Sequence, residues 1–320
     1  MTDAGAVLRD LIAIEGPIPF ARFMEIALYH PEHGYYRGSR DPFGAAGDFF
    51  TAAQLQPVFG ALVARAIESL FEAMGRPPDF TVVDLGAGRS EMAPAFSGWR
   101  YVAVDAARGA LPERFRGVVF ANEFFDALPV EVVVRRGDQF RRMLVACDGE
   151  RFLWQEGACV SGDLQSCLDL YGAPLEDGNV LEVGLEARRW LERLAARLER
   201  GYLLAIDYGY TGREILRFPA GTLMSYRRHT ALDDVLADPG LRDITAHVNF
   251  TALEAHARTL GFERVRFESL GQFLLRAGER DQFAAALAAD TEAGATRRRL
   301  QLKTLLFGMG DVFRVLLLKR

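Results

Sequence analysis

The residues Thr81-Val82-Val83-Asp84-Leu85-Gly86-Ala87-Gly88 decide the fold class of this chain. Apart from Asp84, the first five residues are apolar or β-branched. Such a run is typical of a buried strand in a parallel sheet. The glycines that follow let backbone amides approach a ligand without a Cβ in the way. The stretch therefore predicts a core strand of an open α/β sheet with a ligand-binding loop at its carboxyl end.

A second strand-end signal lies at Val118-Val119-Phe120-Ala121, which runs into Asn122-Glu123-Phe124-Phe125-Asp126. In an open parallel sheet both runs deliver backbone amides and polar side chains to the same edge, where such folds bind ligands. The first signal describes a nucleotide-like cofactor site. The second places two carboxylates and a carboxamide beside it, and together they indicate a methyl-transfer enzyme.

The composition excludes several other classes. The chain has 320 residues, half of them apolar, and a net charge of −5, which suits an α/β domain with an accessory lobe and gives no basic surface for nucleic acid. No uncharged apolar stretch is long enough to span a bilayer, and acidic residues near the start argue against a secretory signal. The three cysteines lack metal-site spacing, so they indicate reduced thiols and we expect a cytoplasmic protein without a metal site. From the charge and the apolar stretches we expect no nucleic-acid or membrane partner.

The apolar pattern divides the chain into an N-terminal helical cap and cofactor-covering segment, residues 1–78, and an α/β core, residues 79–320. In the cap, one helix carries Phe20 to Leu28, and a second begins near Gln56. A helix that began earlier would place Pro57 in its interior, where the proline ring clashes with the carbonyl four residues before it. The core has a helix from Ala187 that Gly201 closes as the residue after the C-cap. Its predicted strands cover residues 80–85, 100–105, 117–122, 202–207 and 313–318.

Three short β-like runs, residues 131–134, 141–145 and 152–154, are separated by Gly137-Asp138 and Asp148-Gly149. They predict a β-meander within an insertion at about residues 131–180. The alternation of strands and helices elsewhere favours a doubly wound, mostly parallel sheet.

The cofactor site is predicted from Asp84, Gly86, Gly88 and Asp105. Asp105 ends the next strand nineteen positions after Gly86, a spacing that suits a carboxylate accepting from ribose hydroxyls. The alternative is an ordinary strand-to-loop turn. Where a dinucleotide fingerprint needs a third glycine the chain has Glu91, so S-adenosylmethionine, which has no phosphate, is favoured over NAD.

The chemistry site is predicted at Asn122, Glu123 and Asp126. Methyl transfer from a sulfonium needs mainly positioning and exclusion of water. If the acceptor is a guanidinium, carboxylates are the required partners, because they hold its planar fork. A helix N-cap, with Asn122 capping and the carboxylates in the first turn, is an alternative that is compatible with catalysis. Tyr208 and His229 are further candidates.

These residues belong to an ordered set of motifs that resembles the MidA-like methyltransferases along nearly the whole chain. The set comprises residues 16–18, 33–36, 47–51, 59–60, 84–89, 122–130, 207–209, 221–223, 229, 243–248 and 309–310. The resemblance implies a Rossmann-like class I methyltransferase fold with a seven-stranded sheet, S-adenosylmethionine as cofactor, and methylation of arginine in a partner protein.

The resemblance also implies residue roles. Asp48 and Thr51 join the cofactor-binding residues, and His229 joins Glu123 and Asp126 on the acceptor side. The chain departs from the family pattern at Ala87 and Ser90 in the glycine loop, at Ala52 to Pro57, and at Asn249, where the family has aspartate.

Three functions stay open at this point. The first is arginine methylation of a partner protein, and the second is methyl transfer to a small molecule or another side chain. The third is a non-catalytic assembly or scaffold protein that keeps the fold. The apolar C-terminal strand and the cap also offer surfaces on which a homodimer could form.

Overall fold

The structure is a computed structural model, and it describes residues 3–37, 52–106, 108–171, 175–227, 230–232 and 234–320. The chain forms two compact units. The sheet unit comprises Thr51–Phe125, Leu191–Gly209 and His256–Arg320, and the meander unit comprises Met1–Phe50, Asp126–Trp190 and Tyr210–Ala255. The division into residues 1–78 and 79–320 stays a prediction.

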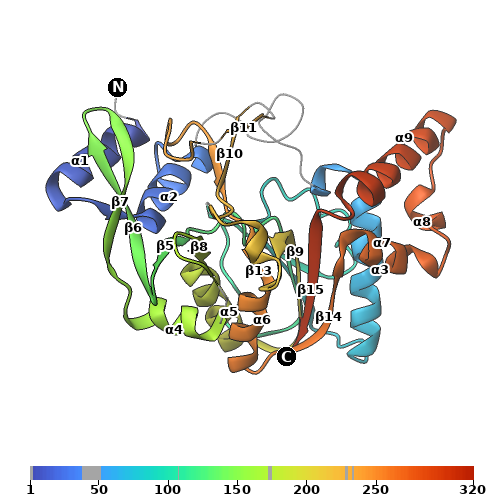
Figure 1. Cartoon of the computed structure of the whole chain (residues 1–320). Helices are drawn as coiled ribbons and strands as arrows, with labels where there is room; N and C mark the ends of the chain where they lie inside the picture. Colours follow the sequence, from blue (N-terminus) through green and yellow to red (C-terminus); the bar gives the residue numbers. More distant parts are fainter. Residues whose placement is uncertain (1–2, 38–51, 107, 172–174, 228–229, 233) are drawn as a thin grey trace. The chain divides into compact units, whose positions relative to one another are not determined.

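The sheet unit is built on strands in the order β14-β15-β9-β4-β2-β3. β3, β2, β4 and β9 run parallel, and β15 is antiparallel to its neighbours β9 and β14, which lie beside it in Figure 1. β2 is buried along its whole length between β3 and β4, which confirms the mostly parallel α/β sheet. The bounds are β2 Phe80–Leu85, β3 Arg100–Val104, β4 Phe115–Asn122, β9 Leu198–Tyr210, β14 Glu263–Ser269 and β15 Phe313–Lys319.

Helices bury their apolar faces against this sheet. Phe59 and Val63 of α3 join Phe120, Leu204 and Val315 of the strands in one buried cluster, because an apolar stripe at helical spacing must find an apolar sheet face. α3 also packs on α7 and α9. The bounds are α3 Val58–Ala73, α5 Leu185–Arg197, α6 Phe250–Thr259, α7 Leu270–Glu279, α8 Ala284–Leu287 and α9 Glu292–Lys303, with a 3-10 turn at Ala52–Gln54 and a π-helical turn at Thr304–Met309.

α3 begins at Val58, directly after Pro57. This confirms that Pro57 delays the helix, because proline is tolerated ahead of the first turn but not within it.

The predicted helix closure at Gly201 is wrong. β9 starts at Leu198, directly after α5, and Gly201 lies inside the strand with a φ of +153°. It pairs with Gly117 of β4, and a Cβ on Gly201 would lie 1.9 Å from the Gly117 carbonyl oxygen. The glycine allows two strands to approach closely. From the local sequence alone, a glycine shortly after a helix is also typical of a helix C-cap.

The meander unit contains the predicted antiparallel meander. β5 (Glu131–Arg136), β6 (Gln139–Asp148) and β7 (Arg151–Cys159) pair in order, with β8 (Val180–Val183) on β5 and β1 (Ile18–Pro19) on β6. The β6–β7 hairpin lies beside α1 (Ala4–Glu15) and α2 (Phe20–Tyr29), as Figure 1 shows. The rest of the unit comprises α4 Gly162–Tyr171, β10 Met224–Arg227, β11 Thr230–Leu232, β12 Asp243–Thr245, β13 Val248–Asn249 and 3-10 turns at Tyr35–Arg37 and Ile215–Arg217.

Phe20 and Phe23 of α2 pack with Val145 and Phe152 of the hairpin to form the core of this unit. Across the part of the chain that the structure describes, no helix combines the length and the apolar character that a membrane crossing requires.

Candidate active site

The predicted glycine loop follows β2 at the carboxyl edge of the parallel strands. Gly86 and Gly88 have φ angles of +68° and +47°, a left-handed geometry that favours glycine. The Gly86 amide donates to the carbonyl of Val104 at 2.8 Å, so the loop crosses the end of β3. A Cβ on Gly86 would lie 3.0 Å from the ring of Phe124. The loop thus lies at the edge where α/β sheets bind ligands, and neither glycine carries a Cβ there.

Asp105 lies beside this loop, at the end of β3. Its carboxylate accepts from the Gly88 amide at 2.7 Å, and Arg108 donates to the Gly88 carbonyl at 2.5 Å and to Ser90 Oγ at 2.8 Å. Ser90 has a φ of +61°, so it keeps a backbone geometry suited to the glycine that the family has here. The loop and the carboxylate are therefore held together by hydrogen bonds, as a cofactor site with a ribose-binding acid requires.

Asp84 is buried in β2, two residues before Gly86. The Tyr101 hydroxyl donates to its carboxylate at 2.7 Å. Burial raises the pKa of Asp84 to about 7; the Tyr101 hydrogen bond opposes this rise, and the charges of Glu91 and Asp105 add to it. Burial and the charge of Asp84 also raise the pKa of Tyr101.

Asn122 and Glu123 lie at the end of β4, on the same edge. Glu123 Oε1 accepts from Asn122 Nδ2 at 2.9 Å and from the Ala52 amide at 3.0 Å. Glu123 has a φ of +50°, unusual for a residue with a Cβ, and its amide donates to the carbonyl of Ile206 at 2.9 Å. Two groups therefore hold the carboxylate, and Ile206 holds the backbone of the same residue.

The alternative of a helix N-cap at Asn122 is wrong, because residues 123–130 form turns rather than a helix. The amides that a helix N-cap would satisfy are taken by another side chain. Asp207 Oδ2 accepts from the amides of Phe124 at 3.2 Å and Phe125 at 2.9 Å, and Asp207 Oδ1 accepts from the Tyr208 amide at 3.0 Å.

Asp207 is a positioning residue that the sequence argument missed. It is fully buried at the end of β9, and it fixes the turn that follows Glu123. The only local signal was its place at a strand end, in Asp207-Tyr208-Gly209, which is equally typical of a plain turn.

Asp126 begins the meander unit and is buried there, with 5% of its surface exposed. Its charge contributes to raising the pKa of Tyr36, after burial, Asp243 and Tyr29, and it also contributes to raising that of Tyr226, where burial is the largest cause. The Tyr36 hydroxyl donates to Asp243 Oδ1 at 2.8 Å. Asp126 therefore lies in an environment of tyrosines and a second carboxylate.

Three predicted site residues, Asp48, Thr51 and His229, lie outside the described residues. Asn249, where the family has aspartate, caps α6 by accepting from the Ala252 amide at 3.0 Å. Asparagine and aspartate are equally good N-caps, so the helix start is kept.

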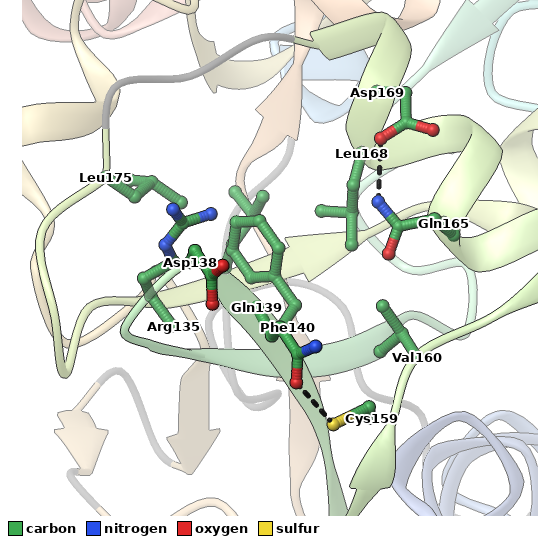
Figure 2. Close-up of a pocket in the computed structure, with 11 residues that line it drawn as sticks. Arg135, Asp138, Gln139, Phe140, Cys159, Val160, Gln165, Leu168, Asp169 and Leu175 are labelled. Carbon is green, nitrogen blue, oxygen red and sulfur yellow. Dashed lines mark hydrogen bonds between the residues drawn. The ribbon is translucent and has the colours of Figure 1, made fainter.

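A pocket of about 350 Å³ lies in the meander unit (Figure 2). Phe140, Val160 and Leu168 form apolar walls, and Cys159 Sγ donates to Gln139 Oε1 at 3.0 Å. None of the predicted catalytic or cofactor residues lines it. Within the described ranges, no three His, Cys, Asp or Glu side chains gather as metal ligands would.

Residues 98–267 match the family model described as "Putative S-adenosyl-L-methionine-dependent methyltransferase". The chain belongs to this family. The match spans β4, Glu123 and Asp207, so it includes the carboxylate site described above. The predicted methyltransferase class is confirmed, and the cofactor is S-adenosylmethionine. The loop fits it, because two glycines without a Cβ lie beside the Asp105 carboxylate.

Named relatives and a solved structure agree with the family. The chain is 30% identical over 315 residues to the mitochondrial "Protein arginine methyltransferase NDUFAF7 homolog" of Drosophila melanogaster, covering 79% of this chain and 70% of the relative. It is 26% identical to the human mitochondrial NDUFAF7, covering 76% and 66%. A crystal structure from Burkholderia thailandensis, bound to S-adenosyl-homocysteine, matches with a TM-score of 0.87 and 31% identity, covering 99% of this chain and 92% of that one.

The expected cytoplasmic location is contradicted by these names, because the curated relatives are named as mitochondrial proteins. The expectation rested on unpaired cysteines. Reduced thiols indicate a reducing compartment without saying which one.

Proposed function

We propose that this methyltransferase transfers a methyl group to a guanidinium nitrogen of arginine in a partner protein, with Glu123 holding the guanidinium. The observation that carries the proposal is the Glu123 carboxylate, held by Asn122 and the Ala52 amide at the carboxyl edge of the sheet. The names of the fly and human relatives support arginine as the acceptor.

A fixed carboxylate suits this substrate. A guanidinium presents N–H donors in a planar fork, and charge-assisted hydrogen bonds to a carboxylate are stronger than neutral ones. The left-handed backbone of Glu123 costs roughly 1–3 kcal/mol, and such strain persists where the surroundings determine it. The bonds from Asp207 to the following turn provide that constraint.

The bound cofactor supplies a methyl group on a positively charged sulfur. Transfer forms the N–CH3 bond and breaks the bond from methyl to sulfur, whose electron pair stays on sulfur, and the nitrogen releases a proton. Glu123 orients the nitrogen, draws its positive charge away from the reacting lone pair, and accepts that proton. Phe124, whose ring lies against Gly86, excludes water from the loop.

The remaining site residues have proposed roles. Gly86 and Gly88 offer backbone to the cofactor, Asp105 accepts from its ribose hydroxyls, and Asp84 faces its amino-acid part. Asp48 and Thr51 complete the cofactor residues, and Asp126 and His229 serve the acceptor side.

The test compares Glu123→Gln with Glu113→Gln, which alters an exposed glutamate of the same unit. Soluble protein from source cells lacking the gene is incubated with S-adenosylmethionine carrying a heavy methyl group, and methylarginine is read by mass spectrometry. We expect Glu123→Gln to bind S-adenosylhomocysteine normally in calorimetry and to lose transfer, while Glu113→Gln keeps both. If wild type labels no arginine, the arginine proposal fails; if Glu123→Gln keeps full turnover, the role of Glu123 fails.

We also propose a homodimer as the form of the protein in solution. Leu300 of α9 and Phe307 of the π-helical turn are 59% and 83% exposed, so both offer apolar surface to a second copy of the chain. Sedimentation of the wild type and of Phe307→Ser measures the mass. A monomeric wild type rules the dimer out.

A further inference from the structure

Asn122 has an acceptor that no group in the described chain uses. Its Oδ1 atom is buried and has no hydrogen-bond donor among the described residues. The orientation of the carboxamide follows from charge, because Nδ2 donates to Glu123 Oε1 at 2.9 Å. A flipped amide would point its oxygen at a carboxylate oxygen.

The oxygen lies at the ligand-binding edge. Ala121 of β4 pairs with Leu85 of β2, so Asn122 is the next step along β4 and Gly86 the next step along β2. The Glu123 turn follows at once. Burying a carbonyl oxygen without a hydrogen-bond donor costs free energy of folding. At the edge of the sheet where ligands bind, such an oxygen indicates that the ligand supplies the donor.

We propose that Asn122 Oδ1 accepts an N–H of the methyl acceptor, so that Asn122 and Glu123 together bind a nitrogen group through two of its N–H bonds. This inference rests on the proposed function, because it takes the guanidinium held by Glu123 as the group that donates.

The hydrogen-bond pattern favours the acceptor over the cofactor as the donor. Asn122 is bonded to Glu123, the carboxylate assigned to the acceptor, whereas the glycine loop is bonded to Asp105. A carbonyl oxygen cannot take up the released proton, so its role is to orient the nitrogen while Glu123 accepts the proton. A hydroxyl or thiol acceptor has one hydrogen and cannot serve both groups, so the pair selects nitrogen nucleophiles with at least two N–H bonds.

The test uses agmatine, a small guanidinium compound, and pentyltrimethylammonium, a cation without N–H, with the full chain saturated with S-adenosylhomocysteine. In calorimetry we expect Asn122→Ala to weaken agmatine binding about tenfold or more, the scale of one charge-assisted hydrogen bond. Binding of S-adenosylhomocysteine and of pentyltrimethylammonium should stay within twofold of wild type.

Asn122→Asp separates contact from positioning and guards against a misfolded alanine variant. It keeps an acceptor oxygen but loses the donation to Glu123, so we expect it to retain agmatine affinity within a few-fold. Equal losses in both variants would mean that Asn122 only positions Glu123, and would overturn the inference. Weakened S-adenosylhomocysteine binding would assign Asn122 to the cofactor and overturn the inference. A wild type that does not bind agmatine would also overturn the inference. Failure of the arginine proposal is read separately, from absent methylarginine in the wild-type labelling.

Discussion

The buried carboxyl group of Asp84 predicts how the free energy of unfolding changes with pH. Asp84 lies in β2 with 3% of its surface exposed, and its carboxyl group accepts a hydrogen bond from the Tyr101 hydroxyl at 2.7 Å. Burial disfavours the charged form and raises its pKa from 3.8 to about 7. The perturbation is Asp84→Asn, which keeps the shape and an acceptor oxygen for Tyr101 but cannot ionise.

The magnitude follows from linkage. In the folded protein Asp84 stays protonated up to about pH 7, whereas in the unfolded chain it ionises near pH 3.8. Unfolding therefore releases a proton between these values, and the stabilisation, complete below about pH 3.8, is lost as the pH rises through about 7. A pKa rise of about 3.2 corresponds to about 4 kcal/mol at 1.36 kcal/mol per pKa unit.

The assay is urea unfolding of wild type, Asp84→Asn and the exposed control Asp290→Asn at several pH values from 5 to 8. Wild type should lose about 3 kcal/mol relative to Asp84→Asn across this interval, since about two pKa units of the effect remain above pH 5. The difference between wild type and Asp290→Asn should stay constant. A wild-type difference from Asp84→Asn that does not change with pH would refute the argument, because the buried carboxyl would then titrate as it does in the unfolded chain.

Two other sites give predictions. Asp105→Ala should weaken S-adenosylhomocysteine binding about ten- to a hundredfold in calorimetry, because it removes a charged acceptor and releases the Gly88 amide; an unaltered dissociation constant would reject the ribose role. Gly201→Ala should lower the free energy of unfolding by about 3 kcal/mol or more, because its Cβ would lie 1.9 Å from the Gly117 carbonyl oxygen. Gly98→Ala, where a Cβ meets nothing within 4 Å, is the control, and equal stability of the two variants would contradict the close approach.

Local pattern was sufficient for much of the fold. The strand at Phe80–Leu85 was predicted with the bounds that the structure shows, because an apolar β-branched run between a proline-rich turn and a glycine loop has few other solutions. Pro57 located the start of α3 for the same kind of reason. Gly201 was misassigned because a glycine after a helix has two local interpretations, and only its partner Gly117 distinguishes them.

The sequence by itself determined the glycine loop after β2, the acid at the end of β3 and the polar residues at the end of β4, since periodicity and glycine placement are local properties. Only the tertiary structure decided what Glu123 does. Its carboxylate is held by the amide of Ala52, 71 residues away, and its turn by Asp207, more than 80 residues away. Hydrogen bonds of this kind have no spacing rule in the chain, because the two ends meet only when the sheet and its preceding segment have packed.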